Sequence, residues 1–310
     1  MSILCFYHRA DPDGWCSAAI LYHEISQKFG KFGIELHGID YGDIFPWDKI
    51  NPQREVWMLD FALQPFALMV ELKTKCKSLT WIDHHKTAIA DAQKAEELFK
   101  GFQSTGMSGC ELTWMFLHGN SPMPEAVNLI GRYDVWKWKD VPNALEFNVG
   151  LRARKEVNKP TSDLWTRLVH PNYEAGSYGL IDRLIYTGTM LLDYRNDDWR
   201  IYATGHTFHT DLELIQKDSG ALYLIGACNR GGANSQFFDS IAIQNKFKDV
   251  DFFISFAWKK GLWQVRLWKP DWLENDIDCG EIAKYFGGGG HVGAAGFQRT
   301  REQGLPFELR

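Results

Sequence analysis

Histidine and aspartate side chains gather in a short segment near the start of the sequence. His8, Asp11 and Asp13 lie within HRADPDG, where Pro12 and Gly14 favour a tight turn that projects the three side chains into one place. One imidazole with two hard carboxylates suits Mn2+, and less well Fe2+ or Mg2+, in preference to an ion that binds thiolates. The segment also fits an aspartate-rich helix cap followed by a glycine turn, so both interpretations stay open.

Two further segments carry the same residue types. Asp60 closes the apolar run EVWMLD, and Asp83, His84 and His85 follow the run LTWI. A single carboxylate after a strand is often only the cap of the next helix, but three such strand ends are hard to explain in that way. Two adjacent histidines cannot both face one core, because successive side chains of a strand point to opposite faces. We therefore predict a metal-binding cluster.

The elements that position this cluster follow from the apolar pattern of the first half of the chain. Short apolar runs alternate there with stretches of helical periodicity, which is typical of βαβ units that build a parallel sheet with helices on both faces. Ligands of such α/β sheets gather at the carboxyl ends of the strands. The segments HRADPD, LD and DHH each follow a strand-like run, so we expect all three at this edge.

The second half of the chain shows a different order of elements. Residues 173–199 have apolar positions at helical spacing and a charged end, and we expect one long helix that connects two domains. Strands are expected at residues 221–228, 251–258 and 262–268, and a short helix at 279–286 precedes the glycine-rich segment FGGGGHVGAAGF. No group of carboxylates converges in the sequence on His206 or His209, so we place both on a strand and not at a metal site.

Length and composition narrow the class of protein. A chain of 310 residues that is 45% hydrophobic is large enough for two cores. It has no apolar run near the ~18 residues that span a bilayer and no export-signal pattern, so we expect a cytoplasmic protein without a membrane partner. The six cysteines form no C-x-x-C pair, which indicates reduced thiols. We interpret Cys16, three residues after Asp13, as a packing residue and not a ligand.

Charge and aromatic content bear on the substrate. A formal net charge of -5 argues against a protein that holds long nucleic acid by neutralising many phosphates, and a short phosphate-bearing substrate fits better. Trp136 and Trp138 lie near Asp134, where aromatic side chains could stack on bases. We nevertheless expect most of the thirteen tryptophans to be packing residues.

Five motifs together resemble a known family. HRADPDG, LDFA, WIDHHKT and GRYDVW are similar to the four motifs of the DHH phosphoesterase family, and FGGGGHVGAAGF resembles the closing motif of the DHH-associated domain. They run from His8 to Phe297 in the order of the family. The resemblance implies an α/β fold: a parallel-sheet DHH domain at residues 1–175, a connector helix at 176–200, and a smaller α/β DHH-associated domain with a mixed sheet at 201–310.

The resemblance also implies two divalent metal ions and their ligands. His8 and Asp11 would hold one ion, whereas Asp13, His84 and Asp134 would hold the other, and Asp60 would bridge the two. Many relatives have one more residue between the histidine and the first aspartate, whereas this sequence reads H-x-x-D-x-D. The partition of the first two aspartates between the ions is therefore left open.

Two residues of the DHH motif have roles beside the ions. By the resemblance, Asp83 would accept the N–H of an imidazole and fix the orientation of its ring, and His85 would face the substrate phosphate. Two cations ~3.5–4 Å apart bind phosphate oxygens and lower the pKa of a bridging water. We therefore expect metal-bound hydroxide to be the nucleophile, without a covalent intermediate or a dedicated protein base.

The glycine-rich segment is the candidate grip on the substrate. Gly288, Gly289 and Gly290 leave the backbone free of side chains, so that N–H groups approach an anion, and His291 adds a polar group. In the family this loop holds the terminal phosphate or sugar of the substrate. Asn229 and Arg230 could bind a second phosphate, and an ordinary surface loop is the alternative. The role of Lys269 is equally open.

The leading hypothesis is an exonuclease that degrades short oligonucleotides to mononucleotides. The layout resembles the short oligoribonuclease (nanoRNase) branch of the family, with Mn2+ as the expected cofactor and a short single strand as the partner. A phosphodiesterase or phosphatase for cyclic or linear dinucleotides, cyclic mononucleotides or a nucleoside 3',5'-bisphosphate is the alternative. A non-catalytic binding protein is disfavoured, because all six ligands are present. No protein partner is evident, and a homodimer is left open.

Overall fold

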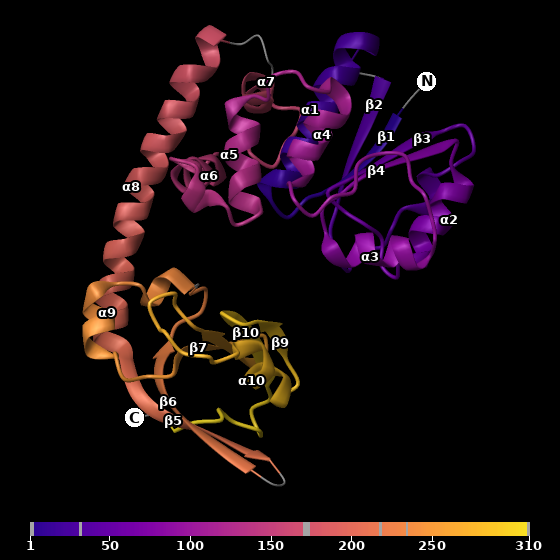
Figure 1. Ribbon diagram of the computed structural model, residues 1–310. Helices are drawn as coiled ribbons and strands as arrows, with labels where there is room; N and C mark the ends of the chain where they lie inside the picture. Colours follow the sequence, from indigo (N-terminus) through magenta and orange to yellow (C-terminus); the bar gives the residue numbers. More distant parts are fainter. Residues whose placement is uncertain (1–2, 31–32, 170–173, 217–218, 234, 309–310) are drawn as a thin grey trace. The chain divides into compact units, whose positions relative to one another are not determined.

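The computed structural model describes residues 3–30, 33–169, 174–216, 219–233 and 235–308. The chain divides into two units, Met1–Leu192 and Asp193–Arg310. Each has its own sheet (Figure 1).

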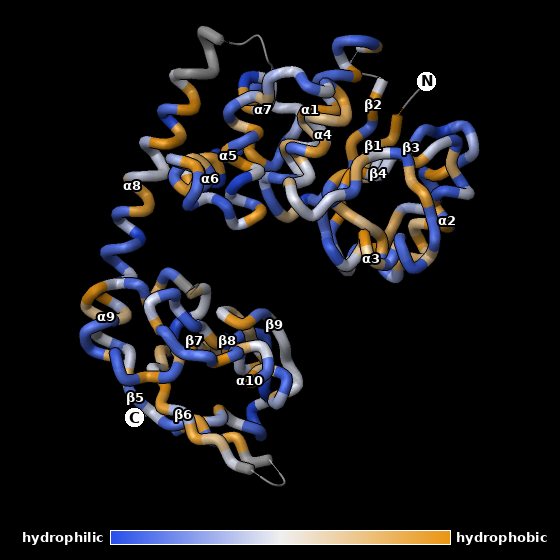
Figure 2. The backbone as a smooth tube through the Cα atoms, viewed as in Figure 1, coloured by the Kyte–Doolittle hydropathy of each residue, from blue (hydrophilic) through white to orange (hydrophobic). Residues whose placement is uncertain are grey.

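The sheet of the first unit is entirely parallel. Its strands are β1 (Ile3–His8), β2 (Ile34–Ile39), β3 (Glu55–Leu59) and β4 (Ser78–Ile82), in the spatial order β2-β1-β3-β4. Figure 2 shows that β1 and β3 are largely hydrophobic, as expected for strands that are covered on both faces. The predicted parallel sheet is confirmed. Because all four strands run in one direction, their carboxyl ends meet at a single edge.

Helices cover both faces of this sheet. Along β1, Cys5 and Tyr7 pack into one core while Leu4 and Phe6 pack into the other, because side chains alternate along a strand. The first core includes α1 (Pro12–Phe29), α4 (Gly109–His118), α5 (Glu125–Asp134), α6 (Ala144–Arg152) and α7 (Asp163–Val169), and the second includes α2 (Ala67–Lys75) and α3 (Lys86–Lys94) (Figure 1). The short 3-10 turns η2 (Trp47–Lys49) and η3 (Trp138–Asp140) lie in the connections.

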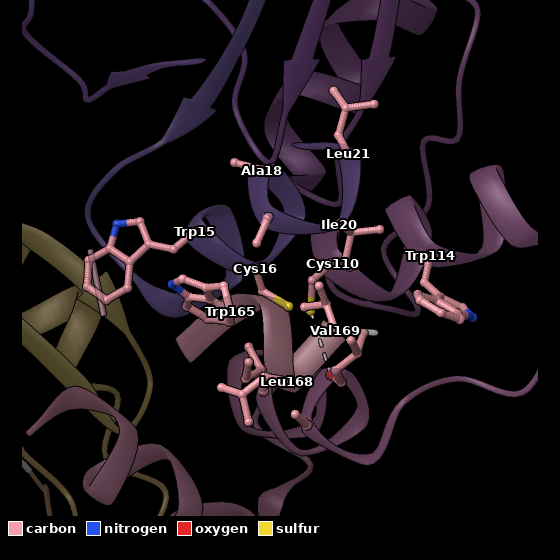
Figure 3. Packing of buried hydrophobic residues seen from close by; sticks show 14 of the residues in the cluster. Trp15, Cys16, Ala18, Ile20, Leu21, Cys110, Trp114, Trp165, Leu168 and Val169 are labelled. Carbon is pink, nitrogen blue, oxygen red and sulfur yellow. Dashed lines mark hydrogen bonds between the residues drawn. The ribbon is translucent and has the colours of Figure 1, made fainter. Parts of the chain in front are cut away.

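Helix α1 is buried along most of its length. Cys16 is fully buried on it and lies beside Trp165 and Leu168 of α7 and Cys110 of α4 (Figure 3). The interpretation of Cys16 as a packing residue agrees with this position. All six cysteines are free thiols and buried.

The second unit is built on a mixed sheet, as predicted. Its strands are β5 (Thr207–Gln216), β6 (Ser219–Asn229), β7 (Phe252–Lys259), β8 (Leu262–Trp268), β9 (Gly289–His291) and β10 (Ala294–Arg299), in the order β5-β6-β7-β8-β10-β9. Among these strands β6 and β7 pair in parallel, and the other neighbours are antiparallel. The helical elements are η4 (Ser235–Phe238), α9 (Ile241–Lys246) and α10 (Cys279–Tyr285).

Two expectations for this unit were wrong in detail. The glycine-rich segment is not an open loop, since Gly289–His291 form strand β9 and pair with β10. His206 is not on a strand but ends helix α8, where its ring packs on Tyr202 at 4.3 Å between centroids. His209 is on β5, as predicted, and its Nε2 lies 3.1 Å from the Asp249 carboxylate.

Helix α8 (Glu174–His206) runs through the division between the two units. Leu180 and Leu184 pack into a core of the first unit, whereas Ala203 and Trp199 pack into a core of the second. The predicted connector, residues 176–200, lies within this helix, and the predicted domain limits stay predictions. Among the described residues, every helix is too short or too polar to cross a bilayer.

Close glycine contacts fix α8 against α6. A Cβ atom on Gly188 would lie 1.7 Å from the carbonyl oxygen of Glu146, and one on Gly150 would lie 1.9 Å from that of Leu184. Gly179, on the same helix, has no atom within 4 Å of an added Cβ.

We expect Gly188→Ala to lower the free energy of unfolding of the first unit by about 1–3 kcal/mol, because the two helices must move apart. Gly179→Ala should instead leave it unchanged or raise it by about 0.5–1 kcal/mol, because alanine favours a helix. Urea denaturation followed by circular dichroism measures both. Equal stability of the two variants would contradict the close packing.

Candidate metal centre

The first group of ligand-type side chains lies at the end of β1. His8 is the last residue of this strand and Asp11 caps the following helix. The Nδ1 atom of His8 lies 3.2 Å from Oδ2 of Asp11 and 3.7 Å from Oδ2 of Asp60. Ligand atoms of these three residues all lie within 4.8 Å of one another. The group could therefore hold a metal ion.

The local sequence explains why helix α1 begins so close to His8. Asp11 Oδ1 accepts hydrogen bonds from the backbone N–H groups of Asp13 and Gly14 at 3.1 and 3.2 Å, and Pro12 supplies a first helical residue that needs no N–H partner. A Cβ on Gly14 would lie 1.9 Å from the His8 carbonyl oxygen, so only glycine permits this approach. The helix cap is confirmed, and it is compatible with the predicted metal ligand, because one oxygen of Asp11 caps the helix and the other faces His8.

Asp60 is placed between two groups of ligands. Directly after β3 it adopts φ 53°, a left-handed conformation that aspartate tolerates better than most residues. Its side chain is buried, with Oδ2 toward His8 and Oδ1 3.2 Å from Nε2 of His84. A Cβ on Gly109 would come within 2.7 Å of the Asp60 Cβ, so the chain crosses this carboxylate at a glycine.

The second group unites α1, the end of β4 and the end of α5. Nε2 of His84 lies 3.6 Å from Oδ2 of Asp13 and 3.3 Å from Oδ2 of Asp134. These three residues again offer ligand atoms within 4.8 Å of one another. The two oxygens of Asp13 accept the N–H groups of Gly109 and Cys110, each at 2.7 Å, so the N-terminus of α4 orients and stabilises this buried carboxylate.

Asp83 organises the turn that presents the two histidines. Its Oδ1 accepts the backbone N–H groups of His84 and His85 at 2.7 and 3.1 Å, and its Oδ2 accepts the indole N–H of Trp81 at 3.2 Å. The same Oδ1 lies 2.6 Å from Nδ1 of His85, which fixes the orientation of that ring. Nδ1 of His85 is also 4.0 Å from Oδ1 of Asp60. The structure thus brings Asp83 and His85, the two residues predicted to act in catalysis beside the ions, to the cluster.

The titration behaviour of the cluster reflects crowded negative charge. Burial and the charges of Asp13 and Asp60 raise the pKa of Asp134 to about 9. Burial and the charge of Asp13 likewise raise the pKa of Asp60 well above its usual range. Burial lowers the pKa of His8, but the carboxylates of Asp11 and Asp60 outweigh this effect and raise it to about 10.

The pKa values of Asp11 and His85 are also shifted by the charged groups next to them. Burial raises the pKa of Asp11, but its contact with His8 outweighs burial, so this pKa is lowered overall. Burial lowers the pKa of His85, and the Asp83 carboxylate more than reverses this, so it is raised overall.

The donor set fits divalent cations. His8 Nδ1 and Asp60 Oδ1 are buried and make no hydrogen bond, although both point into the cluster. Burial of an unpaired polar atom is costly, and a divalent cation between these atoms would use their lone pairs and offset the crowded carboxylate charge. Imidazole and carboxylate ligands suit ions such as Mn2+. The six predicted ligands therefore lie together, and the partition between two ions stays a prediction.

One residue of the centre was missed in the sequence analysis. Asp40 directly follows β2, and its Oδ1 lies 3.4 Å from Nε2 of His8. The signal was present, because Asp40 is a carboxylate after an apolar run, as Asp60 is. The ion pair of buried Glu111 with half-buried Arg132, which joins α4 to α5, was also missed. It links residues 21 positions apart in the sequence, and no local pattern predicts it.

The predicted substrate-binding residues of the second unit do not lie together. Asn229 ends β6, and the pairing across β7, β8 and β10 places it in a row with Phe297, next to β9. Four strand spacings separate β6 from β9, which is ~19 Å, so one phosphate cannot contact Asn229 and Gly289 together. Gly288 and Gly290 approach β10 so closely that an added Cβ would lie 2.1 and 2.5 Å from its backbone.

Two cationic candidates of the second unit already have partners. The Arg230 guanidinium lies 2.8 Å from an Asp198 carboxylate oxygen and covers the rings of Tyr202 and Phe237 at 4.6 and 5.4 Å. The Lys269 ammonium donates to the carbonyl oxygen of Asn275 at 2.7 Å. Phosphate binding by Arg230 therefore stays a prediction and would require the exchange of Asp198 for the ligand.

We expect Asp40→Asn to weaken Mn2+ binding about 10- to 100-fold, the usual effect of removing a carboxylate that orients a metal-binding imidazole. Calorimetric titration of Mn2+ into metal-free protein measures the affinity. Asp48→Asn, which removes the same charge from turn η2, is the matched control and should bind Mn2+ like the parent. Equal loss in both variants would assign the effect to net charge alone.

Known proteins provide an independent view of the fold. No family model matches the sequence. An uncharacterized protein of Acanthamoeba polyphaga mimivirus is 25% identical over 318 residues, which cover 97% of this chain and 69% of that protein. The solved DHH domain of a protein described as a member of a ribosomal protein family has a TM-score of 0.50 and 11% identity, over 96% of this chain and 82% of its own. Exonuclease RecJ bound to manganese has a TM-score of 0.45 and 14% identity, over 97% and 86% of the two chains. The similarity to the solved DHH domain, with its TM-score of 0.50, shows that this chain has the fold of a DHH domain.

Proposed function

We propose that this chain is a metal-dependent phosphodiester hydrolase. The observation that carries the proposal is the convergence of His8, Asp60 and His84 with three further aspartates at the carboxyl edge of one parallel sheet. Such a set of imidazoles and carboxylates suits a pair of divalent cations, which act in many phosphate-cleaving enzymes. The DHH fold and the motif resemblance support the same activity.

The residues of the centre divide into ligands and positioning groups. His8, Asp11 and Asp60 would hold one cation, while Asp13, His84 and Asp134 would complete the second site with Asp60 between the two. When bound, the cations would polarise the phosphate and acidify a water molecule.

The protein groups around the ligands would orient the substrate. Asp83 holds the His85 ring through Nδ1, which leaves Nε2 of that ring free of this contact and suited to hydrogen-bond a phosphate oxygen. The backbone N–H groups at the start of α4 hold Asp13 in place.

We further propose that the substrates are short oligonucleotides, cleaved to mononucleotides with Mn2+ in the cytoplasm. The net charge of -5 disfavours a long polyanion. The mixed imidazole and carboxylate ligands of the centre suit Mn2+. The predicted DHH-associated domain, residues 201–310 within the second unit, is the proposed substrate-binding domain, through Gly288, Gly289, Gly290 and His291 and, at a second point, Asn229 and Arg230.

With Mn2+, the protein should release mononucleotides from two- and five-nucleotide RNA much faster than from twenty-nucleotide RNA. A cyclic dinucleotide and adenosine 3',5'-bisphosphate are assayed beside them, and product analysis by chromatography gives the rates. A bisphosphate rate far above the others would replace the exonuclease proposal by a phosphatase.

We expect Asp60→Ala to lower the rate on the best substrate at least ~100-fold, because metal stabilisation of the transition state is worth several kcal/mol. Asp48→Ala serves as the control. Full activity of Asp60→Ala, measured with protein free of other nucleases, would rule out the proposed metal centre.

A further inference from the structure

Trp136 is unusually placed for so large a hydrophobic side chain. Its side chain is 81% exposed. A single residue, Val135, separates it from the end of α5. Its backbone has φ 59°, in the left-handed region that bulky residues rarely adopt. Exposed indole surface and an unfavourable backbone each cost free energy, and strained residues of this kind cluster at functional sites.

The metal centre lies within reach of this tryptophan. Asp134 precedes it by two residues and places Oδ2 3.3 Å from Nε2 of His84. Two residues of chain span at most ~7 Å, so the Cα atom of Trp136 lies within that distance of the Cα atom of Asp134, which belongs to the group formed with Asp13 and His84. Trp138 differs, because it is half-buried against the core of the first unit and is accounted for by packing.

Tyr41 occupies the corresponding position beside the other group of ligands. It follows Asp40, and its ring lies 5.8 Å from the His8 ring and 4.6 Å from the buried ring of Phe61. The side chain is nevertheless 49% exposed. Phe61 thus supports one side of a ring that remains accessible to a ligand. Each of the two ligand groups therefore has one exposed aromatic side chain next to it.

Aromatic rings in these positions suit a ligand with flat, apolar parts on both sides of a phosphate. A nucleobase stacks on indole or phenol through its π-face regardless of its sequence, whereas pyrophosphate and sugar phosphates have no such face. We propose that Trp136 and Tyr41 are stacking surfaces for the nucleobases on either side of the reacting phosphate. The inference rests on the proposed function and narrows its substrates to phosphodiesters between nucleosides.

Binding without turnover tests the inference directly. AMP and ribose 5-phosphate carry the same phosphate ester and differ by the base, so calorimetric titration of each into the Mn2+-loaded protein isolates the contribution of stacking. The parent should bind AMP more tightly than ribose 5-phosphate. Trp136→Ala should weaken AMP binding about 5- to 150-fold, the range for loss of one stacked base, and leave ribose 5-phosphate within about twofold.

Three further variants separate stacking from other effects. Trp136→Phe should restore most of the preference for AMP, because it keeps an aromatic face. Tyr41→Leu retains an apolar cover over Phe61 and should weaken binding of adenosine 3'-monophosphate, which places its base on the opposite side of the phosphate; unchanged affinity for that ligand would remove Tyr41 from the proposal. Phe29→Ala removes an exposed aromatic at the far end of α1, ~27 Å along the helix from Asp11, and should change nothing.

The outcomes distinguish this inference from the proposed activity. If Trp136→Ala binds both ligands like the parent, or loses both equally, stacking by Trp136 is wrong. If the parent prefers AMP through Trp136 but hydrolyses no phosphodiester, the stacking surface stands and the hydrolase proposal fails.

Discussion

The structure of the first unit depends on accommodating the negative charge of several aspartates at the carboxyl edge of its parallel sheet. Parallel strands must end on the same side, and here several of them end in aspartate. Burial of such groups without counter-charge is expensive, and the raised pKa values of Asp60 and Asp134 express that cost. Much of the surrounding structure serves to hold these groups in place.

The means of holding them differ from one carboxylate to the next. Asp13 receives two backbone N–H groups from the start of α4, and Asp83 receives two from its own turn and an indole N–H from Trp81. Asp11 divides its oxygens between a helix cap and the centre. Glycines at positions 14 and 109 let the backbone approach closely enough for these contacts. Asp11 thus keeps one oxygen for the centre alone, whereas Oδ2 of Asp13 both accepts the Gly109 N–H and lies 3.6 Å from Nε2 of His84.

The sequence predicted the ligand-type residues of the metal centre better than the contacts that hold them in place. Asp60 and His84 could be found because strand ends in a parallel sheet must meet, which turns a local pattern into a spatial prediction. Asp40 obeyed the same rule and was overlooked. The contact of Asp13 with Gly109 joins residues 96 positions apart, and nothing in either segment identifies its partner.

The glycine-rich segment of the second unit shows a different limit of sequence reasoning. Its composition suggested a bare loop for an anion, yet Gly288 and Gly290 are needed because β10 runs so close to them. A glycine leaves the same trace in a sequence whether a ligand or another strand approaches it. Only the pairing of β9 with β10 tells the two apart for these residues.

Helix α8 affects how the two units unfold. Its two ends contribute side chains to different cores, and the boundary between the units falls inside it. A cut there would leave each half with a frayed helix end and an incomplete set of hydrogen bonds. Unfolding of one unit would likewise leave the adjoining end of α8 without its packing partners, and the helical hydrogen bonds next to the boundary would weaken in the other unit. The two units thus share one cooperative element, so their unfolding equilibria are coupled.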